Sequence, residues 1–146
     1  MGFRQDVRAA AVTLLTGFKT ANDSALRQIY PGRPASIYPP CAFVDAINEA
    51  AIVTTRGPRL RSPAVDIIVI QGVFDSDEAT AKQDELVDDF LDYCRAHFDA
   101  AGPASVVTVD RVEDLPAYVP DWIEGAPVYY ATRLTLVGIQ AQGGLI

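Results

Sequence analysis

Two stretches of the chain carry apolar residues at three- and four-residue intervals, the spacing that gives a helix one apolar side. The first stretch covers residues 3–18. The second begins at Asp75, where this aspartate and Glu78 can accept hydrogen bonds from the free amides of a first helical turn, and it ends before Gly102 and Pro103. We therefore expect two amphipathic helices that pack on a sheet.

Other stretches show the patterns typical of strands. In residues 66–74 both alternating faces are apolar, which predicts an interior strand with layers packed on each side. Residues 128–139 are expected to form the last and longest strand. The remaining predicted strands, the first two separated by a break at residues 48–49, are Cys41–Asn48, Ala50–Thr55 and Ser105–Val112.

Prolines and glycines divide the rest of the chain. Residues Ala25–Tyr30 are predicted to form a short helix that Pro31 and Gly32 end, and the segment Glu113–Pro127, which contains three prolines, is predicted to be irregular. Residues 140–146 are expected to be a loose tail. Because parallel neighbours need long crossovers, the closely spaced strands before residue 75 favour an antiparallel meander.

This order of elements predicts one α+β domain over residues 1–146, a mostly antiparallel sheet of about five strands with two principal helices packed on it. The helices are expected to cover one face of the sheet. The apolar residues on the other face need cover as well, which either another subunit or the curled sheet itself supplies.

Both cysteines, Cys41 and Cys94, lie in apolar segments and lack the spacing of a metal site or a disulfide framework. No apolar stretch approaches the roughly 18 residues expected of a membrane span, and the first residues lack the apolar core of a signal peptide. We therefore expect a cytoplasmic protein with no membrane partner.

Side chains that could form a catalytic site are few. His97, the only histidine, lies one helical turn from Cys94 and is interpreted as a helix-end residue, because no Cys/His fingerprint or further ligand is near it. The sequence contains no phosphate loop, nucleophile elbow or dinucleotide fingerprint. It therefore predicts no enzyme, no cofactor and no metal site.

Charge divides unevenly along the chain, whose formal net charge is −7. Residues 1–61 hold eight Lys and Arg against four Asp and Glu, whereas residues 62–146 hold four against fifteen. Copies of such a chain could meet head to tail with opposite charges facing each other. On charge alone, two differently solvated surfaces of a monomer are the favoured interpretation.

The strongest local charges lie in two segments. Three arginines, Arg56, Arg59 and Arg61, precede the interior strand, and the polar side of the second helix carries Asp84, Glu85, Asp88, Asp89 and Asp92. Cation loops usually add turn glycines and carbonyl ligands, so a solvated or interfacial acidic face is favoured over a cation site. A sequence pI of about 4.5 argues against nucleic-acid binding. We expect the arginines to meet the acidic helix of a neighbour, the alternatives being weak contacts with phosphates and a solvated hairpin tip.

Several features occur together: an opening helix, proline-rich segments at 30–34 and 38–42, a strand meander with an arginine-bearing hairpin, the strand 66–74 leading into an acidic helix, and a closing strand at 129–136. In this layout and in length, over nearly the whole chain, the protein resembles the tail terminator (tail completion) proteins of long-tailed bacteriophages.

The resemblance implies a non-enzymatic assembly protein at the head–tail junction of the virion, assembled in the host cytoplasm. Members of that family form a hexameric ring on the finished tail tube, stop its polymerisation and join the head through its connector. The implied partners are further copies of the chain, the tail tube protein and a head-completion or connector protein, with DNA only as cargo. On this hypothesis Arg56, Arg59 and Arg61 contact a ring neighbour or the tube. Asp84, Asp88 and Asp92 then face an adjacent subunit or the DNA passage.

Two other interpretations stay open. One is a head-completion or neck protein of the same virion, which would have similar size and composition. The other is a small cytoplasmic ligand-binding module in which Trp122, Tyr118 and Tyr129 line a pocket, although aromatic residues in a proline-rich loop more often close the end of a core.

Overall fold

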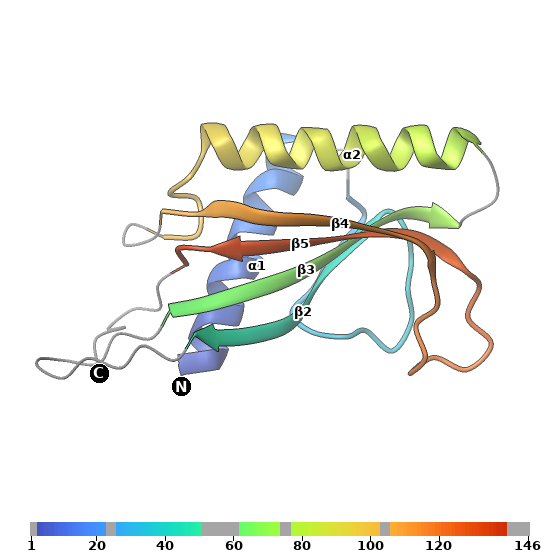
Figure 1. Cartoon of the computed structure of the whole chain (residues 1–146), viewed down its shortest axis with the longest axis horizontal. Coiled ribbons are helices and arrows are strands. Elements are labelled where there is room, and N and C mark those ends of the chain that lie inside the picture. Colours follow the sequence, from blue (N-terminus) through green and yellow to red (C-terminus); the bar gives the residue numbers. More distant parts are fainter. Residues whose placement is uncertain (1–2, 23–25, 51–61, 74–76, 103–105, 140–146) are drawn as a thin grey trace, which may run out of the picture.

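The structure, a computed structural model, describes residues 3–22, 26–50, 62–73, 77–102 and 106–139. It is an α+β fold in which a five-stranded mixed sheet carries two helices on one face (Figure 1), so the predicted fold class is confirmed. The helices are α1 (Phe3–Ala21) and α2 (Asp77–Ala96). The strands are β1 (Gln28–Tyr30), β2 (Cys41–Ala50), β3 (Ser62–Val73), β4 (Thr108–Tyr118) and β5 (Tyr129–Val137).

The strands lie in the order β1-β2-β3-β5-β4. β2, β3, β5 and β4 are antiparallel neighbours, whereas β1 is parallel to β2. The last strand in sequence, β5, is therefore inserted between β3 and β4. The two edges of the sheet are the three-residue strand β1 and the eleven-residue strand β4.

The larger core lies between the sheet and the two helices. Phe18 of α1 and Phe90 of α2 meet edge to face with ring centroids 5.1 Å apart, and Tyr93 packs on Phe18 at 5.6 Å. The predicted two-faced strand is confirmed in β3, whose alternate residues enter opposite clusters. Its helix-facing residues and those of β5 are Val65, Ile67, Val69, Leu134 and Leu136.

The opposite face of the sheet is covered at one end by segments of the same chain. Trp122 packs on Phe43 with ring centroids 5.8 Å apart, and its Nε1 donates a hydrogen bond to the carbonyl of Pro34 at 2.8 Å. The guanidinium of Arg33 lies 4.7 Å from the centre of the indole ring and pairs with Asp45 at 2.8 Å. This second cluster includes Ile37, Cys41, Phe43, Ile68, Ile70, Tyr129 and Ala131.

The rest of this face is polar. Thr135 Oγ1 donates to Asp66 Oδ1 at 2.8 Å, and Arg133 and Arg111 approach Glu113 at 3.6 and 3.3 Å. An antiparallel sheet commonly has part of one face exposed to water, and these polar side chains form that part.

Three details of the predicted elements were wrong, in β1, in β2 and in β4. Residues 28–30 form β1 rather than part of a short helix, because pairing with β2 satisfies backbone groups that one isolated helical turn leaves free. β2 continues through residues 48–49 to Ala50, with a register shift between Val44 and Ile47 instead of a break. The part of the predicted strand Ala50–Thr55 after Ala50 lies outside the described residues.

β4 also extends beyond its predicted end, through residues expected to be irregular, to Tyr118. Pro116 is accepted because β4 is an edge strand and its register shifts between Leu115 and Tyr118, where a missing amide breaks no ladder. The predicted strand at 128–139 is confirmed over Tyr129–Val137. The predicted tail at 140–146 lies outside the described residues.

Candidate functional site

Among the described residues, β4 is an edge strand whose outer side pairs with no other strand. Along Thr108–Tyr118 the strand pairs only with β5, and the described part of the chain shows no further backbone hydrogen bond to these residues. Most of the strand is exposed to solvent. An edge of this length presents a row of free amides and carbonyls to which another strand can be added.

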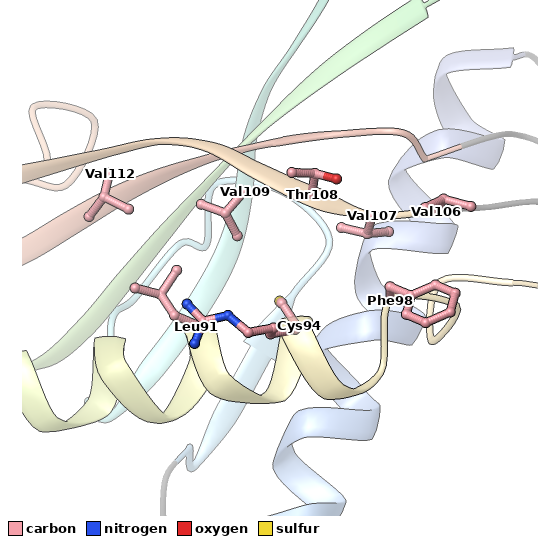
Figure 2. A pocket seen from close by; sticks show the side chains of 9 residues that line it. Leu91, Cys94, Phe98, Val106, Val107, Thr108, Val109 and Val112 are labelled. Atoms are coloured by element: carbon pink, nitrogen blue, oxygen red, sulfur yellow. The ribbon is translucent and has the colours of Figure 1, made fainter.

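A groove of about 450 Å³ runs between this strand and the C-terminal half of α2 (Figure 2). It is mainly apolar, and three of its residues are large hydrophobic side chains that remain exposed: Phe98 at 51%, Val106 at 63% and Val112 at 45%. Leu91, Cys94 and Arg95 form its wall on the helix, so one cationic side chain lines the groove. Exposed apolar residues gathered in one place are typical of an interaction surface, whereas single ones are not.

Two backbone hydrogen bonds fix the closed end of the groove. The amide of Val107 donates to the carbonyl of Phe98 at 2.8 Å, and the amide of Val106 donates to the carbonyl of Gly138 at 3.2 Å. The end of α2, the start of β4 and the end of β5 are thereby joined. The lining residues all fall between Leu91 and Val112, on and between two consecutive elements, but whether they stay exposed depends on the strand order, which was not predicted.

The acidic residues predicted on the second helix all lie exposed on α2: Asp84, Glu85, Asp88, Asp89 and Asp92. Asp92 Oδ1 pairs with Arg95 Nη1 at 3.7 Å. This contact is weak, because both side chains are largely exposed to water. None of these five carboxylates is part of a metal-binding cluster: no group of three His, Cys, Asp or Glu that could hold a metal ion occurs in the described ranges.

Asp84 and Asp88 lie exposed on α2, nearer its start than the residues that line the groove. Residues three, four and seven positions apart share one side of a helix, so both carboxylates lie on the side that carries Leu91, a lining residue. Burial raises the pKa of Tyr130, and the nearby carboxylates of Asp114 on β4 and Asp84 on α2 raise it further. One surface therefore passes from apolar at the end of α2 to acidic near its start.

The predicted arginine cluster, Arg56, Arg59 and Arg61, lies outside the described residues. The strand ends on either side of it are described: Ala50 of β2 pairs with Ser62 of β3. The segment 51–61 thus connects two antiparallel neighbours, as expected of a hairpin.

His97 and Cys94 do not form a joint site. The imidazole of His97 stacks on Tyr93 at 4.4 Å and its Nδ1 lies 3.2 Å from the carbonyl of Tyr93, in the exposed last turn after α2. Cys94 instead lies where the groove wall meets the core, and it is 3% exposed. The three aromatic residues proposed to line a pocket also pack as core: Tyr118 and Trp122 meet edge to face at 6.4 Å, and Tyr129 is buried.

Burial predicts that both thiols are unreactive in the folded protein. It raises the pKa of Cys41 and of Cys94 to about 12, so that at pH 8 only on the order of one thiol in ten thousand is a thiolate, the reactive form. We expect a chromogenic disulfide reagent to label neither cysteine in native protein and both after unfolding in guanidinium. Rapid labelling at pH 8 without unfolding would contradict the burial of these side chains.

The same pKa shifts predict a loss of stability at alkaline pH. Because the folded-state pKa of each thiol lies above its ordinary value of 9.0, the folded protein retains these protons more tightly than the unfolded chain. The stabilisation is complete below about pH 9 and declines as the pH rises toward 12. Urea unfolding at pH 8 and pH 10.5 should show this decline, and the Cys41→Ala/Cys94→Ala variant should show less of it.

Neither described helix is long and apolar enough to cross a membrane. In comparisons with known proteins, no family model matches the chain and no curated protein sequence matches it significantly.

Proposed function

We propose that this chain is a structural subunit that assembles head to tail into a ring capping a bacteriophage tail tube. The ring ends tube polymerisation and presents the surface that joins the head, with DNA passing through it as cargo. The observation that carries the proposal is the open edge of β4 beside an exposed apolar groove. Such a surface suits a lasting protein–protein contact.

The charges around the groove favour a head-to-tail contact over a two-fold one. In a two-fold dimer through β4, the acidic sides of two α2 helices would come together, and Asp84 and Asp88 would meet like charges. The first 61 residues carry a net charge of +4 and offer the opposite sign. A contact between different surfaces of successive copies continues until it closes a ring or grows a filament.

The tail-tube assignment rests on the resemblance of the sequence layout to that of tail terminator proteins. The implied partners follow from it: further copies of the chain, the tail tube protein, and the head-completion or connector protein. A net charge of −7 suits a passage through which DNA must move without adhering, because like charges repel.

We expect the purified protein to form a closed ring whose population rises with protein concentration and falls with salt. Opposite charges are screened within about 10 Å at 0.1 M salt and about 3 Å at 1 M salt, so high salt weakens the contact. Native mass and negative-stain images of the largest species measure this. If the protein is monomeric in solution, the same variables are tested on purified tail tubes. A protein that neither forms rings nor caps tubes would overturn the proposal.

A further inference from the structure

We propose that the segment 51–61 of one copy adds to the outer edge of β4 in the next copy and fills the groove beside α2. The inference rests on the proposed ring and specifies the contact between its subunits. The occupant is thus a second copy of this chain, which supplies one donor segment and one acceptor edge per subunit.

The segment has the composition that the acceptor surface requires. It begins Ala-Ile-Val-Thr-Thr, a run of β-branched residues suited to a strand, and continues with Arg56, Arg59 and Arg61 and no acidic residue. The acceptor is apolar around Phe98, Val106 and Val112, apart from Arg95, which pairs with Asp92, and it carries carboxylates farther along. Both partners therefore divide in the same way into an apolar part and a charged part, and the charges are opposite.

The length of the open edge also fits. The register of β4 shifts between Val109 and Arg111, and from Arg111 to Leu115, before the proline at position 116, the strand offers its outer amides and carbonyls without a further shift. At about 3.3 Å per residue this is long enough for a five-residue strand such as 51–55. The added backbone hydrogen bonds supply affinity, and the side chains in the groove supply specificity.

The direction of the added strand follows from the order of apolar and charged residues along the groove and along the donor segment. The apolar end of the groove lies at the start of β4, and the carboxylates of Asp84, Asp88 and Asp114 lie toward its end. Ile52 and Val53 precede the arginines in the donor segment. The apolar residues of the two partners meet, and the arginines of the donor meet the carboxylates of the acceptor, only if the segment runs parallel to β4.

Charge reversal tests this pairing with an internal rescue. The donor variant Arg56→Glu/Arg59→Glu/Arg61→Glu has an acidic segment facing an acidic edge, and the acceptor variant Asp84→Lys/Asp88→Lys has a basic edge facing a basic segment. We expect each variant alone to lose the assembled species. An equal mixture should recover it, because alternation of the two variants makes every contact complementary, and an even-numbered ring can close in this way.

The matched control is Glu85→Lys/Asp89→Lys, which makes the same charge change on exposed positions of the same helix, each turned by about 100° from its neighbour in the acceptor variant. We expect this control to assemble like the wild type. Assembly is measured in solution, or on tail tubes if only these support it, and recovery in the mixture itself shows that both variants are folded.

The possible results separate the two proposals. If the wild type assembles and both reversal variants assemble equally well, the segment 51–61 does not pair with β4, whereas the ring stands. Loss in each variant without recovery in the mixture would also overturn the pairing. A wild type that assembles neither alone nor on tubes removes the ring itself, and with it this contact.

Discussion

Replacing Gly138 with alanine is expected to destabilise the fold by about 2–5 kcal/mol, the largest effect that we anticipate from adding a single methyl group. Gly138 has φ +89°, and a β-carbon there would collide with the backbone carbonyl of Val106. A left-handed backbone costs a non-glycine residue about 1–2 kcal/mol, and overpacking adds about 1–3 kcal/mol. Urea unfolding measures the sum.

Two other glycines separate these contributions. Gly125 has φ +74° but open space around a β-carbon, so Gly125→Ala should show the backbone cost alone, about 1–2 kcal/mol. Gly72 has neither a positive φ nor a neighbour within 4 Å, and Gly72→Ala should leave stability unchanged or slightly raised. Equal effects at all three positions would show that the close approach of Gly138 to Val106 is not maintained.

Gly138→Ala should also alter the groove. The clash falls on the carbonyl of Val106, whose amide is bonded to Gly138 and whose side chain lines the groove. Any relief of the clash moves the start of β4 away from β5. We therefore expect assembly to weaken in this variant even at temperatures where it remains folded.

Replacing Gln83 with alanine is expected to cost about 2–4 kcal/mol, the second large effect. Gln83 lies on α2 and is fully buried, yet every polar atom of its side chain is paired. Its Oε1 accepts a hydrogen bond from the backbone amide of Gln71 at 2.8 Å. Its Nε2 donates to the carbonyl of Val69 at 2.9 Å and to Thr132 Oγ1 at 3.0 Å.

The cost arises because this side chain forms hydrogen bonds with the backbone where the pairing of β3 and β5 is irregular. The register between β3 and β5 shifts between Ile70 and Gly72, and the amide of Gln71 is satisfied by the helix instead of by a strand. Without Gln83, that amide and the carbonyl of Val69 lose buried partners, at about 1–3 kcal/mol for each group left unsatisfied. Chemical denaturation, followed by circular dichroism, gives the change in the free energy of unfolding.

The matched control is Gln71→Ala, because the bond to Gln83 uses the backbone of residue 71 and survives loss of its side chain. We expect this substitution to change stability by no more than about 0.5 kcal/mol. A Gln83→Ala variant as stable as Gln71→Ala would mean that the helix does not support the sheet at this point.

The elements with a strong intrinsic pattern could be predicted from the sequence. α1 and α2 have apolar residues at helical intervals, and β3 has two apolar faces, so each carries its own signal. Residues 28–30 carry none, because their conformation is decided by pairing with Cys41–Phe43 of β2. The end of β4 was missed for a related reason: Pro116 argues against a strand until its position at an edge is known.

The candidate site could be predicted only in part. The acidic side of α2 follows from helical periodicity, and its five carboxylates are exposed as expected. The groove depends on the strand order, which places β4 rather than β5 at the edge below α2. An alternating strand reads the same at an edge as in the middle of a sheet, so Val106 and Val112 gave no sign that they would remain uncovered.

The strand order also sets when the protein can fold during its synthesis. β5 is the last described element to leave the ribosome, yet it holds β3 and β4 together along most of their lengths. Until it emerges, β3 has one unpaired side and β4 has no neighbour in the sheet. The nascent chain therefore exposes unpaired backbone groups on β3 and β4, and the complete sheet can form only after residue 137 is translated.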